Sequence, residues 1–87
     1  MKVLAQPIEV VSYTDFKGDI RPLRFRVQIG DEPLKVIKID KVIFKQLEKF
    51  AGNPMILYRC QSLDGNVEKV LEIKYELNTC KWILYKI

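Results

Sequence analysis

The chain has 87 residues, of which 15 are basic, 11 are acidic and none is histidine, so its formal net charge is +4. This length fits one domain with one modest core, and the lack of histidine removes the most common general base and the most common metal ligand. The four glycines stand far apart, so the sequence has no glycine-rich phosphate loop. We therefore expect a single domain over residues 1–87 that is not an enzyme and has no cofactor and no metal site.

The first part of the chain predicts β-strands separated by turns. Residues 8–13 are expected to form a short strand. Residues 23–29 alternate apolar residues with arginine and glutamine, which is the pattern of a strand with one buried and one exposed face. A glycine and a proline within residues 30–33 predict a turn into a third strand over residues 34–39.

The pairing of these two strands predicts an irregularity. A tight turn at residues 30–33 would place Lys38 opposite Phe25, inside the core. One extra residue at Val36–Ile37 would instead place Ile39 opposite Phe25 and bring Lys38 to the outer face. We therefore predict a β-bulge at Val36–Ile37.

Residues 40–51 have two interpretations. As a helix, the segment begins at Asp40 as its cap, ends at Gly52 and has an apolar stripe. As a strand, the segment extends the preceding apolar run, and Gly52 turns the chain back. Phe44 would lie on the polar side of the helix, which favours the strand, but both interpretations stay open.

The last third of the chain predicts a hairpin and a closing strand. Asp64-Gly65 is a strong signal for a two-residue hairpin turn, which would place Tyr58 opposite Leu71 on the buried face. After a turn near Asn78, Trp82 returns to the same core. Five or six such strands predict a mainly β fold, a small antiparallel barrel of SH3-like or bent-meander form, because curling removes exposed edges.

Positive charge is concentrated in the middle of the chain. Eight basic residues and four acidic residues lie between Arg21 and Lys49. Small barrels often bind single-stranded nucleic acid in a basic groove, so a basic strand face on a curved sheet indicates a nucleic-acid partner. The candidate nucleic-acid-binding residues are Arg24, Arg26, Lys35, Lys38 and Arg59.

The predicted registers also leave apolar side chains on the outer face of the last three strands. A contiguous apolar surface of this kind needs a cover, which is either another part of the chain or a protein partner, including a second copy. Protein association or homodimerisation is therefore the alternative to nucleic-acid binding. The candidate interface residues are Met55, Leu57, Val70, Ile83, Tyr85 and Ile87.

Cysteine usage and hydropathy bear on location. Cys60 and Cys80 are not in a C-x-x-C arrangement, so we expect structural thiols rather than a zinc site. The first residues become polar too soon for a signal peptide, and no apolar run reaches the roughly 18 residues of a membrane span. We expect a cytoplasmic protein with reduced cysteines and no membrane partner.

Several segments resemble known sequences. Pro22–Arg26 (PLRFR), Lys35–Ile39 (KVIKI), Arg59–Ser62 (RCQS) and the closing Cys80–Tyr85 (CKWILY) look like small uncharacterised bacterial all-β proteins. They are more distantly similar to a domain family of unknown function that can be encoded beside Y-family DNA polymerases. This resemblance covers most of the chain and implies an all-β barrel in a nucleic-acid-linked setting, and it carries over no catalytic residue.

Overall fold

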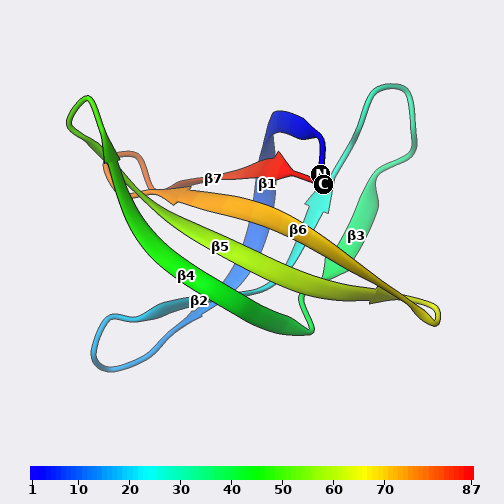
Figure 1. Cartoon of the computed structure of the whole chain (residues 1–87), viewed down its shortest axis with the longest axis horizontal. Helices are drawn as coiled ribbons and strands as arrows, with labels where there is room; N and C mark the ends of the chain where they lie inside the picture. The colour runs from blue at the N-terminus through cyan, green and yellow to red at the C-terminus, as the bar shows by residue number, and fades with distance from the viewer.

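The computed structural model describes all 87 residues, and all of its regular elements are β-strands (Figure 1). They form one antiparallel sheet in the order β3-β2-β1-β7-β6-β5-β4. The mainly β, antiparallel prediction is confirmed. The seven strands are β1 (Val3–Thr14), β2 (Ile20–Val27), β3 (Lys35–Lys38), β4 (Lys41–Phe50), β5 (Asn53–Asp64), β6 (Val67–Glu76) and β7 (Lys81–Lys86).

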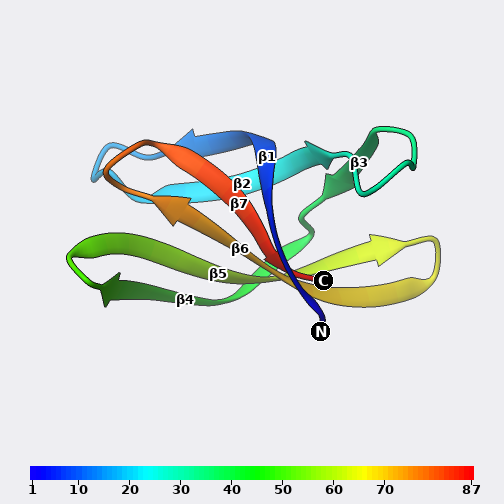
Figure 2. The same ribbon diagram turned by 90° about the horizontal axis from the view of Figure 1, so that it is seen from above.

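The sheet curls but does not close into a barrel. Figure 2 shows β1 and β2 on one side of the molecule, β4 and β5 on the other, and β6 and β7 crossing between them. Its two edge strands, β3 and β4, are consecutive in the chain. The prediction of a barrel with five or six strands is therefore wrong in closure and in strand number.

A kink at Ile39–Asp40 explains the difference in strand number. The Ile39 N–H donates to the Leu23 carbonyl, 2.9 Å away, whereas the next N–H, that of Asp40, donates to the Gln61 carbonyl, also at 2.9 Å. The chain therefore changes partner within two residues, from β2 to β5, and one long strand becomes β3 and β4. The helix interpretation of residues 40–51 is wrong, because Lys41–Phe50 is a strand that pairs with β5, with one irregularity between Val42 and Phe44.

The predicted β-bulge at Val36–Ile37 is absent. The ladder between β2 and β3 is regular and places Phe25 opposite Ile37 and Arg26 opposite Val36. The connection between the two strands spans residues 28–34, which is longer than the tight turn assumed from the sequence. This longer loop sets the register directly, so the core pairing needs no extra residue.

The β5–β6 hairpin is displaced by two residues from its predicted register. Its turn is Gly65-Asn66, with Gly65 at a φ of 66°, the left-handed conformation that a two-residue hairpin turn requires. Tyr58 consequently lies opposite Ile73, not Leu71. A shift of two residues keeps every side chain on its predicted face, so the expected core is preserved.

The core lies on the inner face of the curled sheet. Trp82 packs against Tyr58 and Tyr75, with ring centroids 5.6 and 4.7 Å apart. The Tyr58 hydroxyl donates a 2.6 Å hydrogen bond to the Ile20 carbonyl and so joins β5 to β2 across the core. The buried cluster consists of Phe25, Val27, Ile37, Ile39, Tyr58, Cys60, Leu71, Ile73, Trp82 and Leu84.

The two chain ends lie side by side (Figure 1). Lys2 and Ile87 exchange two backbone hydrogen bonds of 2.8 and 3.0 Å, which continue the β1–β7 pairing to the ends of the chain. No helix capable of crossing a membrane is found.

Candidate functional site

The outer face of β2 and β3 carries part of the predicted basic site. Arg24 lies opposite Lys38 and forms no ion pair. The next arginine along this face, Arg26, donates to both carboxylate oxygens of Glu9, at 2.9 and 3.1 Å. These hydrogen bonds and the charge of Arg26 lower the pKa of Glu9. The charge of Arg26 is thus matched within the molecule, whereas the charge of Arg24 has no carboxylate partner.

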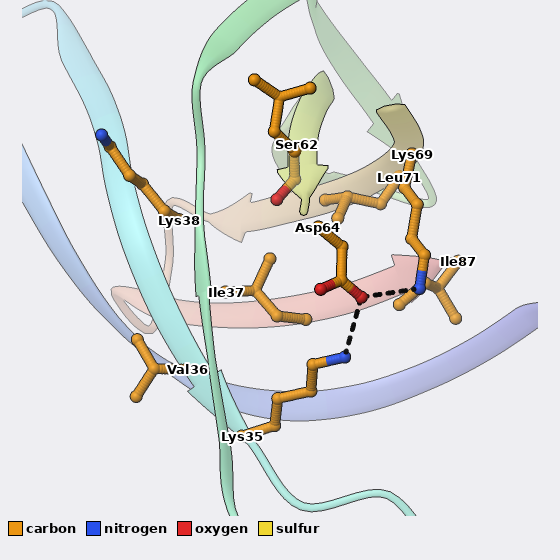
Figure 3. A pocket seen from close by; sticks show the side chains of 10 residues that line it. Lys35, Val36, Ile37, Lys38, Ser62, Asp64, Lys69, Leu71 and Ile87 are labelled. Atoms are coloured by element: carbon orange, nitrogen blue, oxygen red, sulfur yellow. Dashed lines mark hydrogen bonds and ion pairs between the residues drawn. The ribbon is translucent and has the colours of Figure 1, made fainter. Parts of the chain in front are cut away.

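Lys35 lies on the inner face of β3, opposite Val27, and Lys38 lies on the outer face. Figure 3 shows Lys35 and Lys69 directed at Asp64, with Nζ to Oδ2 distances of 3.7 and 3.3 Å. The hydrogen bond from Lys69 and the two positive charges lower the pKa of Asp64. These groups rim a cavity of about 70 Å³ between β3 and the end of β5, which is large enough for a few water molecules and too small for a cofactor.

Arg59 is not part of the basic face either. It lies on β5, separated from β2 in the sheet by β1, β7 and β6. Its guanidinium binds Glu72 on β6, with both Nε and Nη2 2.9 Å from Oε2, and lies 5.7 Å from the centre of the Phe44 ring. Because Glu72 is only 3% exposed, this arginine is committed to a structural ion pair.

The predicted apolar interface is largely covered by the chain itself. Leu57 is buried, and only Val70 among the six residues is exposed. Ile87 packs against the main core, so it does not belong to an outer patch. The other three members, Met55, Ile83 and Tyr85, are half-buried.

A charged side chain provides much of this cover. Lys74 lies between Leu57 and Ile83 on the outer face, as the strand registers require. Its Nζ is 3.0 Å from Oε1 of Glu48 and 3.8 Å from the centre of the Tyr85 ring. The apolar stem of Lys74 can therefore shield its neighbours while its ammonium group is held by a carboxylate and an aromatic face.

Uncovered apolar surface is instead concentrated on the edge strand β4. Phe50 is 65% exposed and Leu47 is 55% exposed, and Ile43 and Phe44 are also exposed. No other strand pairs with the free edge of β4. A long apolar edge strand is an open template for another strand, which folded proteins usually shorten, cover or charge.

The backbone of β4 presents hydrogen-bonding groups to this free edge. Phe50 and Asn53 flank the two-residue turn and pair with each other, so alternate residues from Phe50 backwards direct their N–H and C=O groups to β5. The intervening residues Lys45, Leu47 and Lys49 direct theirs to the open side. Their side chains lie on the inner face, where Lys45 is opposite Tyr58.

The free edge of β4 was not predicted from the amino-acid sequence. Ile43, Leu47 and Phe50 form the apolar stripe of the helix interpretation, with Lys41, Lys45 and Lys49 on its far side, and Ile43 also belongs to the apolar run of the strand interpretation. The signal was the lysine at every fourth position of an apolar strand, which is typical of an edge protected against unwanted pairing.

Comparison of the chain with protein families, curated proteins and solved structures found no match. The resemblance to bacterial all-β proteins and to the polymerase-associated domain family stays a prediction. No group of three or more Cys, Asp or Glu side chains is arranged to hold a metal ion.

Proposed function

We propose that this protein is a non-catalytic binding module that associates with another protein by strand addition at β4. The observation that carries the proposal is the coincidence of an unpaired backbone edge with exposed apolar side chains on one strand, Leu47 on the inner face and Phe44 and Phe50 on the outer face. In strand addition, main-chain hydrogen bonds supply affinity and the alternating side chains supply specificity.

Site-specific crosslinking in cells tests the proposal. A photoreactive phenylalanine analogue at position 44 or 50 should crosslink to a protein partner. The same analogue at Phe16, which is 95% exposed but lies in the β1–β2 turn, serves as the matched control and should not. Equal crosslinking from Phe16 and from β4, or none from β4, would refute strand addition.

Leu47→Pro tests the backbone contribution. Proline removes an N–H that faces the open side of β4, and edge strands tolerate such a proline. The variant should remain folded and lose the crosslink. Gln46→Pro is the comparison, because its N–H faces β5 and its loss should unfold the hairpin.

A second candidate function is nucleic-acid binding on the outer face of β2 and β3. The observation that favours it is the adjacency of Arg24, which has no ion pair, to Lys38, which is exposed although its Nζ lies 3.9 Å from Oδ1 of Asp40. Affinity for a single-stranded oligonucleotide should then fall steeply with salt, because bound phosphates release counterions. Arg24→Glu combined with Lys38→Glu should abolish this affinity, and unchanged retention would exclude the site.

A further inference from the structure

We infer that the strand accepted by β4 comes from an extended acidic segment of a partner protein and not from a second copy of this chain. The inference rests on the proposed function, since it specifies the chemistry of the partner at the same edge. It follows from the charges along β4 and from the faces on which they lie.

The free edge of β4 is positively charged. Lys41, Lys45 and Lys49 are spread along the strand, and its only acidic residue is Glu48. The Glu48 carboxylate lies on the outer face, 3.0 Å from Lys74, and is therefore already matched. A partner strand places its side chains about 5 Å from those of β4, so its charge decides whether pairing is favourable.

Lys45 already forms an ion pair with a carboxylate on the inner face. Its Nζ lies 3.9 Å from Oδ1 of Asp19 in the β1–β2 turn and 5.6 Å from the centre of the Tyr58 ring. Lys49, four residues further along β4 on the same face, forms no ion pair. A carboxylate of a partner strand would be the second acidic neighbour of Lys45, after Asp19. It would be the first ion-pair partner of Lys49.

The two faces of β4 define a pattern for the partner. Side chains opposite Lys45 and Lys49 share the inner face and should be acidic. The alternate side chains share the outer face with Phe44 and Phe50 and should be apolar. Because strand side chains alternate between faces, the matching segment alternates acidic and apolar residues.

A second copy fits this edge poorly. Two antiparallel β4 strands related by a two-fold axis keep the same residues on the same face. When the axis passes through Leu47, Lys45 of each copy lies directly opposite Lys49 of the other. Like charges in directly opposed positions destabilise a strand pair, and every register brings together two strands with an excess of lysine.

Peptide binding tests the inference. The probe is a ten-residue peptide that alternates glutamate with valine, and its comparison peptides alternate lysine with valine or scramble the glutamate peptide. Fluorescence anisotropy should show binding of the alternating glutamate peptide at least about tenfold tighter than that of the others, weakening as salt is added. Equal affinity for the glutamate and lysine peptides would overturn the acidic preference.

Charge reversal provides the matched controls. Lys45→Glu combined with Lys49→Glu should lose the glutamate peptide and gain the lysine peptide. Lys17→Glu combined with Lys86→Glu, which makes the same change in net charge away from β4, should change neither. Lys49→Glu alone is a second test that leaves the contact between Lys45 and Asp19 intact, and circular dichroism confirms that each variant is folded.

The outcomes separate the inference from the proposed function. If sedimentation shows a dimer that Leu47→Pro abolishes, the partner is a second copy and the acidic inference is wrong, although strand addition holds. If the glutamate peptide does not bind while crosslinking from β4 persists, the partner chemistry is wrong and the edge function again holds. If Leu47→Pro changes neither the crosslinking from β4 nor the binding of the glutamate peptide, both strand addition and the acidic partner are wrong.

Discussion

Arg59 holds the carboxylate of Glu72 through two nitrogen atoms, Nε and Nη2, each 2.9 Å from Oε2. The carboxylate is almost inaccessible to water, whereas the arginine is about half exposed. The pair joins β5 to β6 on the outer face of the sheet, where the registers place the two residues directly opposite each other. It accounts for the presence of a buried acidic side chain on this face, because the guanidinium supplies the carboxylate with a charged hydrogen-bond partner.

Arg59→Met should destabilise the protein by about 1–3 kcal/mol, because it leaves Glu72 buried without its partner. Arg26→Met is the matched control. Its partner Glu9 is exposed, so the loss of stability should be clearly smaller than that of Arg59→Met. Urea denaturation measures both changes, and equal losses in the two variants would contradict a structural role for Arg59.

Asp40 provides a second test at the kink between β3 and β4. Its Oδ2 accepts a 2.7 Å hydrogen bond from the Leu63 N–H, which extends the contact with β5 beyond the last β4 pair. Asp40→Ala should cost about 1 kcal/mol and speed hydrogen exchange at Leu63. Asp40→Asn retains an acceptor oxygen and should protect that amide. If Asp40→Ala leaves the exchange rate unchanged, the side chain does not hold this junction.

Stability should fall at alkaline pH because of two buried groups. Burial is the main cause that raises the pKa of the Cys60 thiol from 9.0 to about 12 and that of Tyr58 from 10.0 to about 12. Between these values the unfolded chain has lost protons that the folded chain keeps, so the free energy of unfolding decreases as pH rises from about 9 to about 12. Each group contributes up to about 1.4 kcal/mol per pH unit.

Cys60→Ala isolates one of these contributions. Its unfolding free energy should change less than that of the wild type between about pH 8 and about pH 10. Ser62→Ala is the control, since Ser62 is also buried on β5 but its hydroxyl does not titrate in this pH range, so the variant should leave the pH dependence unaltered. An identical pH dependence in the wild type and Cys60→Ala would show that the thiol does not contribute.

Ala51 tests the turn that fixes the β4 edge. The residue has a φ of 51° and precedes Gly52, which has a φ of 76°. A side chain in this left-handed region costs roughly 1–2 kcal/mol, so Ala51→Gly should raise the free energy of unfolding by about 1 kcal/mol. Ser12→Gly, within β1, should lower it. A lower thermal midpoint for Ala51→Gly would contradict the assigned backbone conformation.

The candidate site was only partly predictable. The sequence places Arg24 and Lys38 on one outer face, and the structure brings them together, although in a different register. Arg59 has the same character in the sequence, but its partner Glu72 was missed, because the predicted hairpin register differs by two residues from the observed one and places Val70 opposite Arg59. The free edge of β4 was not predicted, because the apolar residues of a strand look the same at the centre of a sheet and at its edge, and the regularly spaced lysines fit the polar side of a helix equally well.

The amino-acid sequence by itself determines the fold class and the inner face of this protein. Alternation with a period of two places Phe25, Tyr58 and Leu84 in the core, and a register shift of two residues leaves those faces unchanged. The tertiary structure alone decides which residues oppose one another, where the strand kinks at Asp40, and which edge stays unpaired. Those features depend on loop lengths and on backbone hydrogen bonds between distant segments. The alternation of apolar and polar side chains specifies neither of them.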